Sequence, residues 1–170
     1  MTRQDAVTLL DYHYWARDRM LDAVDALTAE QYAKDMGSSF KSVRDTVVHT
    51  YGGEWNWYER WVGHSPTALP DVSMFPDVAA LRTAWKTQER NVRLLVDALA
   101  SANELDRAFK YRTFDGQETE SVFSHMLQHV VNHATFHRGQ VTTMLRQLGV
   151  PAPKQQDLIR FYRERATRVH

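Results

Sequence analysis

Four long stretches of this sequence repeat apolar residues at the spacing of an α-helix, and this periodicity constrains the fold more than any other feature. They cover approximately residues 4–26, 42–63, 77–102 and 120–148. Gly149 and Pro151 follow the last stretch, which is typical of a helix end. The chain contains no internal repeat and no shift in composition that would divide it. The pattern predicts an all-α protein, an antiparallel-type four-helix bundle, in a single domain over residues 1–170.

The segments between these stretches have patterns of their own. Thr28 and Gln31 have the spacing of a capping box, which predicts a short turn of helix. Residues 64–76 contain three prolines and predict a loop long enough to help shape a site. Residues 105–121 alternate in polarity around an Asp-Gly pair, and this favours a short β-hairpin before the last long helix. Residues 157–169 predict a short C-terminal helix.

Composition narrows the classes of function. The chain has 21 basic and 21 acidic residues, so no charge excess indicates a nucleic-acid or membrane partner. No apolar run approaches the roughly 18 residues of a membrane span, and the N-terminus lacks the pattern of a secretory signal. We therefore expect a soluble, cytoplasmic protein. The absence of cysteine means that any metal ion must be held by histidine and oxygen ligands.

The last long helix carries four of the eight histidines, spaced four residues apart: His125, His129, His133 and His137. Each step advances the side chain by about 40° around the helix axis. His137 falls inside the stripe formed by the apolar residues of this helix, and His133 falls just within its edge. His129 lies at the margin and His125 lies further out. The periodicity therefore selects His133 and His137 as an inward-facing pair.

Two interpretations of this pair remain open at this stage. The imidazoles either share a metal ion in the bundle interior or make separate hydrogen bonds there. Ala134 follows the first histidine, so the general-base glutamate of an HExxH protease is missing. A third ligand would come from another segment, with His13, His49, His64 or a carboxylate as candidates. His129 would substitute if His49 were not a ligand.

His49 is the candidate on the second long helix, and the local pattern does not decide its role. Gly52 and Gly53 follow one turn later, although glycine costs a helix about 1 kcal/mol relative to alanine. Such residues often mark the close approach of a neighbouring element or ligand. The densest apolar face of this helix nevertheless lies opposite His49. The side chain either lines a cavity or faces water.

Several neighbouring residues have weaker interpretations. Glu54 lies about 140° from His49 on the helix, which favours a contact with a ligand residue or between helices over a role as a ligand itself. Gln140 is expected to hydrogen-bond near a ligand histidine. Gly139 is expected to permit close helix packing, and Arg138 to pair with an acid at a helix interface. The five tryptophans are assigned first to the core or to a dimer interface.

Three segments resemble the DinB/YfiT-like helical bundle proteins. They are YHYWARDRML at residues 12–21, VVHTYGGEWNW at 47–57 and, most specifically, HVVNHATFHRGQV at 129–141. The resemblance covers nearly the whole chain. It implies a four-helix bundle, commonly a homodimer, with a divalent metal ion held by three histidines. Carried onto this sequence, the implied ligands are His49, His133 and His137.

The resemblance also implies a type of chemistry. Three histidine ligands leave coordination positions open, as in catalytic metal sites, and zinc or nickel would suit them. Similar proteins include transferases and isomerases that use low-molecular-weight thiols such as bacillithiol or mycothiol. We therefore expect a metal-dependent enzyme that acts on a small-molecule substrate by thiol-linked transfer, with its catalytic acid and base unassigned. The alternative is a non-enzymatic, stress-related bundle that binds a metal or ligand. Metal should be lost as the pH falls below about 6, because protonated imidazole does not coordinate.

Overall fold

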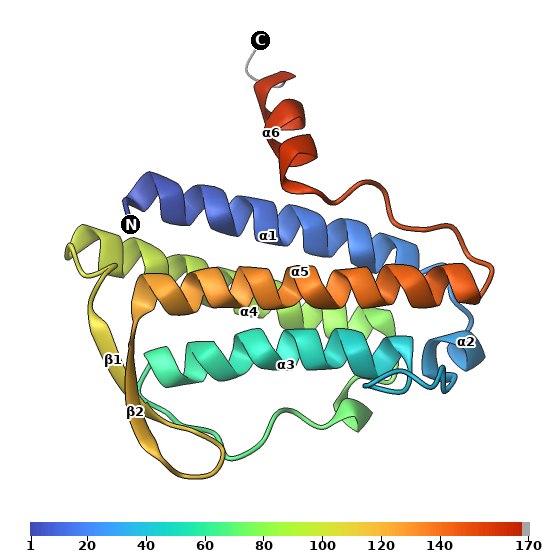
Figure 1. Ribbon diagram of the computed structural model, residues 1–170, viewed down its shortest axis with the longest axis horizontal. Helices are drawn as coiled ribbons and strands as arrows, with labels where there is room; N and C mark the ends of the chain where they lie inside the picture. Colours follow the sequence, from blue (N-terminus) through green and yellow to red (C-terminus); the bar gives the residue numbers. More distant parts are fainter. Residues whose placement is uncertain (168–170) are drawn as a thin grey trace.

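The computed structural model describes residues 1–167, which form a bundle of four long helices with a small two-stranded sheet at one end (Figure 1). In chain order the elements are α1 (Arg3–Val24), α2 (Ala29–Ala33), α3 (Val43–Trp61), the 3-10 helix η1 (Val72–Met74), α4 (Val78–Ser101), β1 (Ala108–Arg112), β2 (Glu118–Val122), α5 (Phe123–Gln147) and α6 (Leu158–Thr167). The predicted four-helix bundle is confirmed, including the hairpin and the short C-terminal helix. Within residues 1–167, none of the helices has the length and apolar content needed to cross a bilayer.

The order of the helices around the bundle places the second and last long helices side by side. α5 packs against both α1 and α3, and α4 packs against α1 and α3 on the other side. In Figure 1, α1 and α5 run in one direction, while α3 and α4 run in the other. Because α3 and α4 are consecutive but parallel, the proline-rich connection between them returns along the bundle. That connection brings Leu69 and Pro70 against Gly52 of α3.

Local signals in the sequence set most helix starts. Thr2 and Asp5 form a capping box at the start of α1, and the predicted box of Thr28 and Gln31 opens α2. The Ser42 hydroxyl accepts a hydrogen bond from a backbone N–H at the start of α3. These caps satisfy N–H groups that the helix itself cannot pair.

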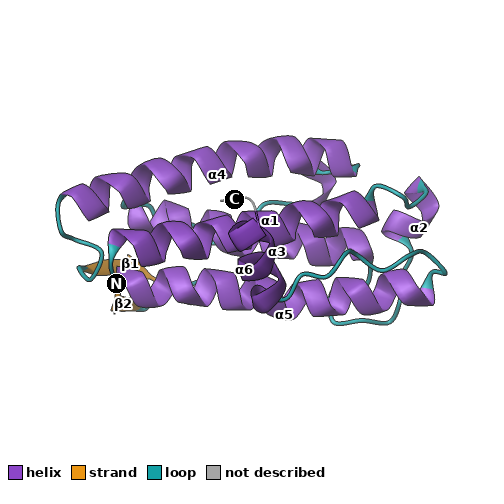
Figure 2. Cartoon of the chain, turned by 90° about the horizontal axis from the view of Figure 1, so that it is seen from above, coloured by secondary structure: helices purple, strands orange, loops and turns teal. Residues whose placement is uncertain are grey.

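The apolar faces of the four long helices meet in one core. Its completely or almost completely buried side chains include Met20, Leu21, Val43, Leu81, Trp85, Phe123, Leu127 and Leu145. They come from all four helices, as the periodicity predicted. A smaller cluster lies where Phe161 of α6 packs edge-on against Tyr12 and Trp15 of α1. Seen from above, α4 and α5 lie on opposite sides of the bundle, and α6 stands over its middle (Figure 2).

Two predicted helix boundaries differ from those in the structure. The last long helix begins at Phe123, not at residue 120, because residues 120–122 belong to β2 and pair with β1. The helical pattern of apolar residues cannot predict this pairing, because a strand forms only when its partner strand lies beside it. The short C-terminal helix was predicted over 157–169, and it ends at Thr167, while positions 168 and 169 lie outside the described residues.

Candidate metal centre

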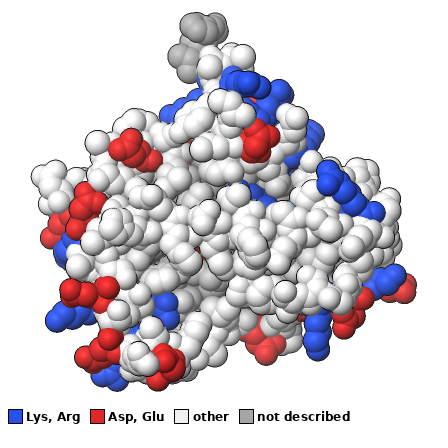
Figure 3. Space-filling view, in the orientation of Figure 1, with Lys and Arg blue, Asp and Glu red and all other residues white. Residues whose placement is uncertain are grey.

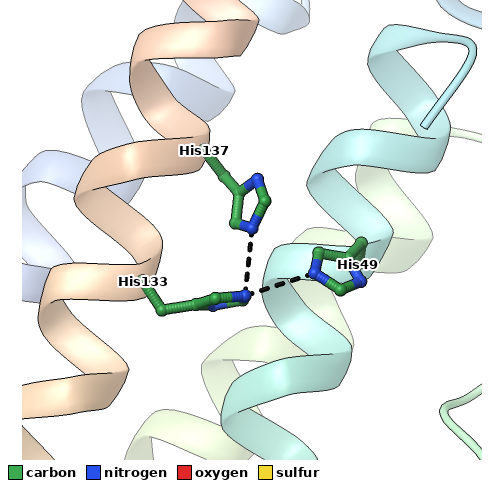
Figure 4. Close-up of side chains that lie close together, drawn as sticks. All are labelled: His49, His133 and His137. Carbon is green, nitrogen blue, oxygen red and sulfur yellow. Dashed lines mark hydrogen bonds between the residues drawn. The ribbon is translucent and has the colours of Figure 1, made fainter. Parts of the chain in front are cut away.

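Three histidines from two helices converge between α3 and α5 (Figure 4). His49 lies in the middle of α3, and His133 and His137 lie one turn apart on α5. Nε2 of His133 is 3.2 Å from Nε2 of His49 and 3.0 Å from Nε2 of His137. One ligand nitrogen from each of the three lies within 4.8 Å of the other two. Among residues 1–167, this is the one cluster of histidine or acidic side chains with metal-binding geometry. The sequence candidates His49, His133 and His137 are therefore brought together.

The orientation of His49 is set by an aromatic ring that sequence reasoning missed. Phe40, in the loop between α2 and α3, stacks on the His49 imidazole with ring centroids 3.9 Å apart and planes inclined by 20°. The same ring meets His137 edge-on at 5.4 Å. Phe40 lies outside any periodic segment, so no pattern in the sequence indicates that it touches α3 and α5 at once.

The orientation of His133 depends on a glycine. A β-carbon at Gly53 would lie 2.8 Å from Cε1 and 3.1 Å from Nδ1 of the His133 ring, closer than packed atoms allow. Gly53 therefore provides a flat stretch of backbone against which this imidazole lies. The prediction that the paired glycines mark a close approach is confirmed at Gly53, whereas a β-carbon at Gly52 would meet Leu69 and Pro70 of the returning loop at ordinary contact distance.

The orientation of His137 is set by a hydrogen bond. Nδ1 of His137 is 2.7 Å from Oε1 of Gln140, one turn further along α5. The amide oxygen accepts the Nδ1 proton, so Nε2 presents its lone pair towards His133. The expected contact of Gln140 with a cluster histidine is confirmed, and it is the kind of outer contact that orients metal-ligating imidazoles.

The electrostatics keep the cluster neutral at ordinary pH. Burial, with the neighbouring histidines adding to it, lowers the pKa of His49 to about 4 and that of His133 to about 3. Burial also lowers the pKa of His137, although the contact with Gln140 acts in the opposite direction. Neutral imidazoles have lone pairs free for coordination.

Neutral imidazoles cannot satisfy this arrangement by themselves. Nε2 of His133 faces two other Nε2 atoms, and a single proton on it is donated to one of them. One of the two contacts, either His133–His49 or His133–His137, therefore brings two nitrogens together with no hydrogen bond between them. A cation would satisfy all three. Ligands at about 2.0–2.1 Å in a tetrahedral arrangement stand roughly 3.3 Å apart, close to the separations found here. The residues thus fit a divalent metal ion.

The other sequence candidates lie apart from this cluster. His13 and Glu54 are both buried, and Nε2 of His13 is 2.7 Å from Oε2 of Glu54. Glu54 also accepts hydrogen bonds from Tyr14 of α1 and Trp85 of α4. It joins three helices, as the predicted inter-helix contact required. Burial opposes ionisation of Glu54, but these hydrogen bonds outweigh it and keep the pKa below its usual value.

Two further histidines also remain outside the cluster. His64 lies exposed in the loop after α3 and pairs with Glu59. The ring centroid of His129 is 5.9 Å from that of His133, and the His129 side chain is exposed and stands against Trp57.

Two expectations about the end of the histidine motif were wrong. Arg138 has no acidic partner among the described residues; its guanidinium is buried and donates to the hydroxyls of Tyr12 and Thr135. Gly139 is not needed for close packing, because a β-carbon there would meet no atom of residues 1–167 within 4 Å. Arg138 is buried against Tyr12 of α1, whereas Gly139 lies exposed on α5, and helical spacing alone does not identify what lies opposite either position.

Comparisons with known proteins agree with this fold. The model of the DinB family matches residues 1–166. Protein DinB of Bacillus subtilis (strain 168) is 27% identical over 161 residues, which cover 92% of this chain and 94% of that protein. The crystal structure of a DinB-like protein from Bacillus cereus ATCC 10987 matches with a TM-score of 0.61 and 19% identity, covering 86% of this chain and 95% of that one. At that identity, the structural likeness bears on the fold alone.

Proposed function

The chain belongs to the DinB family, and from this premise we propose that it works through one divalent metal ion held by His49, His133 and His137. The observation that carries the proposal is the convergence of three imidazole nitrogens whose mutual contacts leave one pair unsatisfied. Each ring is held by a different neighbour, namely Phe40, Gly53 and Gln140. Such support is what a preorganised ligand set requires.

The ligand set favours an open centre over a closed structural one. Among the described residues, no cysteine or carboxylate joins the three histidines, so one or more coordination positions remain for another molecule. Zinc and nickel both accept imidazole nitrogen, and we propose one of these two as the ion.

We further propose that the centre serves thiol-linked chemistry on a small molecule. A metal ion bound there would lower the pKa of a coordinated thiol or water, so that the anion exists near neutral pH. The protein holds three imidazoles in their neutral form and supplies them as ligands. The thiolate sulfur would then form a C–S bond with an electrophilic carbon of the acceptor, while the bond from that carbon to its leaving group breaks and the leaving group departs with the electron pair.

The metal proposal is tested by measuring metal content. Untagged protein, offered zinc and then nickel, is compared by mass spectrometry with the variants His49→Ala and His133→Ala. His64→Ala is a matched control, since that imidazole is exposed and paired only with Glu59. We expect close to one ion per chain in the wild type and the control, and a large loss in both cluster variants. A wild type that binds neither ion would reject the proposal.

The alternative is a metal-bearing bundle that binds a ligand without turnover. It is favoured by the surroundings of the cluster, because the one buried carboxylate among the described residues, Glu54, is engaged with His13 and two other donors. A panel of thiols with a chromogenic electrophile separates the two. Turnover that disappears in His133→Ala supports the enzyme. If the wild type binds a ligand but turns over the electrophile no faster than His133→Ala does, the non-enzymatic alternative is supported.

The homodimer implied by the family resemblance also stays a prediction. Light scattering over a range of protein concentrations would test it. A molar mass that remains at one chain would contradict it.

A further inference from the structure

Two phenylalanine rings contact the imidazole of one cluster histidine, His137. Phe136 meets the His137 imidazole edge-on at 5.1 Å, and Phe40 meets the same imidazole edge-on at 5.4 Å. They come from different elements, Phe136 from α5 and Phe40 from the loop before α3. We call the two rings and His137 the aromatic wall; it lies beside the cluster because Nε2 of His137 is one of the three converging nitrogens.

Phe136 has no evident structural reason to be aromatic. Its side chain is 65% exposed, and it belongs to neither of the hydrophobic clusters of the bundle. What distinguishes this exposed ring is its contact with a cluster histidine, since ligand sites are lined mainly by apolar and aromatic side chains. Phe136 offers a flat face to a molecule that enters from solvent.

Phe40 is held firmly by its loop. The backbone N–H of Met36 donates to the carbonyl oxygen of Lys41, and that of Lys41 donates to Ser38. Ser42, the cap of α3, donates its own N–H to the carbonyl oxygen of Phe40. Lys41 adopts φ of 58°, a left-handed conformation that L-residues seldom adopt. This bonded turn fixes the Phe40 ring against His49 and His137 from outside the core.

The surroundings of the wall carry little charge. On the face drawn in Figure 3, the charged side chains gather towards the edges, and the middle, over α5 and α3, is almost free of them. Beyond the cluster, the seam between these helices continues with Trp57, which contacts His129 and Tyr111. The phenylalanine rings beside the cluster are thus its aromatic neighbours, and the guanidinium of Arg60 lies further along the seam, over Trp57 and Tyr111.

We propose that Phe40 and Phe136 select ligands that carry a flat apolar ring next to a metal-binding head group. The inference rests on the proposed metal centre: the head group occupies the open coordination position, and the ring packs on the aromatic wall. Aromatic pairs prefer edge-to-face or offset contacts, and each such contact changes affinity by roughly two- to tenfold. The structure thereby assigns a substrate class, a small aromatic molecule or a thiol adduct of one.

Hydroxamates test this without relying on turnover. Benzohydroxamate, cyclohexanecarbohydroxamate and acetohydroxamate share one metal-binding head and differ in having a flat ring, a puckered ring or none. Their affinities for zinc-loaded protein are measured by calorimetry, with the zinc content of each sample determined alongside. The variant is Phe136→Ala, which removes an exposed ring and should leave the fold intact. Phe114→Ala is the matched control, because Phe114 is 50% exposed in the distant hairpin turn.

We expect the wild type and Phe114→Ala to favour the flat ring over the puckered one by at least threefold. Phe136→Ala should lose most of that preference while its affinity for acetohydroxamate stays unchanged. Equal affinities for the two rings in the wild type, or a preference that survives in Phe136→Ala, would overturn the inference and leave the metal centre standing. Protein that takes up neither zinc nor nickel would overturn the metal centre, and this inference with it; protein that takes up only nickel is assayed with nickel in place of zinc.

Discussion

The imidazole of His133 lies so close to Gly53 that a β-carbon at position 53 would stand 2.8 Å from its Cε1 atom. The contact joins α5 to α3 at the candidate metal centre. Of the two groups, the ring is the one able to move, because it ends a side chain, whereas the glycine belongs to a helical backbone.

Gly53→Ala should therefore separate metal binding from folding. The added methyl group turns the His133 ring away from the cluster, and we expect metal affinity to fall roughly 10- to 100-fold, as for other lost supports of ligand histidines. The free energy of unfolding should stay the same or rise by up to ~1 kcal/mol, since alanine favours the helix. Competition with a chelator and urea unfolding measure the two quantities.

Gly52→Ala is the matched control for that variant. Its β-carbon would meet Leu69 and Pro70 at 3.4 to 3.5 Å, which is ordinary contact, and no cluster histidine lies near it. Metal affinity should stay within about twofold of the wild type. Equal losses in the two variants would show that helix α3, and not the His133 ring, is what the substitutions disturb.

Gln140→Leu should weaken metal binding by removing the acceptor for the Nδ1 proton of His137. We expect roughly a 10- to 100-fold loss of affinity, because the ring loses both its orientation and its tautomer. Gln140→Glu keeps an acceptor oxygen and should restore most of the affinity. Gln128→Leu, an exposed position on the same helix, should have no effect. If Gln140→Leu binds metal like the wild type, the hydrogen bond does not position His137.

The metal-free protein should lose stability as the pH falls through the range of histidine titration. In the folded state the pKa is about 4 for His49 and about 3 for His133, whereas imidazole in the unfolded chain titrates near 6.5. The unfolded chain therefore binds protons first. The free energy of unfolding is unaffected by these groups above about pH 6.5 and decreases below it. Urea unfolding at several pH values between 7 and 5 measures how steeply the free energy of unfolding falls.

A His133→Gln variant is the control for this prediction. In that variant the free energy of unfolding should fall less steeply as the pH decreases, because one partly buried imidazole is missing. Glu54 does not interfere in this range. Its pKa lies below the usual 4.5, so its contribution is present above that pH and is lost only at lower pH. An unchanged slope in the variant would mean that His133 is not held neutral by burial.

The same pKa values change the expected pH of metal release. Ordinary histidines would release metal below about pH 6. Because burial lowers the pKa of all three imidazoles, protons compete less well, and the structure moves the expected release to lower pH. Metal content after dialysis at pH 5.5 should remain close to that at pH 7. Complete loss at pH 5.5 would show that the cluster titrates as if exposed to water.

Glu54→Gln should destabilise the bundle without touching the metal ligands. The carboxylate accepts hydrogen bonds from His13, Tyr14 and Trp85. In the variant an amide NH2 group replaces one acceptor oxygen, so it faces at least one buried donor without a hydrogen bond. A buried donor left without its acceptor costs about 1–3 kcal/mol. Glu59→Gln, which loses only a contact with exposed His64, should cost less than about 1 kcal/mol. Urea unfolding of both variants checks the difference, and similar values would contradict the role given to Glu54.

Much of the architecture could be predicted because it depends on local spacing. Apolar periodicity located the four long helices, and the pairs Thr28 with Gln31 and Gly149 with Pro151 marked ends. The start of α5 was placed three residues too early, since β2 forms only when β1 is beside it. Hydrogen bonds within a helix connect neighbours in sequence, whereas those of a hairpin depend on the partner strand.

By itself, the sequence determined that His133 and His137 share the inner face of one helix, because the helical period places residues four apart on the same side. It also marked Gly53 as a position where something comes close. Only the tertiary structure decided that His49 faces the pair across the α3–α5 contact, 84 positions away in the chain from His133. The same packing brought Phe40 onto His49 and left Arg138 among hydroxyl groups. Periodicity fixes which side chains of a helix lie together, but their partners depend on how distant segments pack in three dimensions.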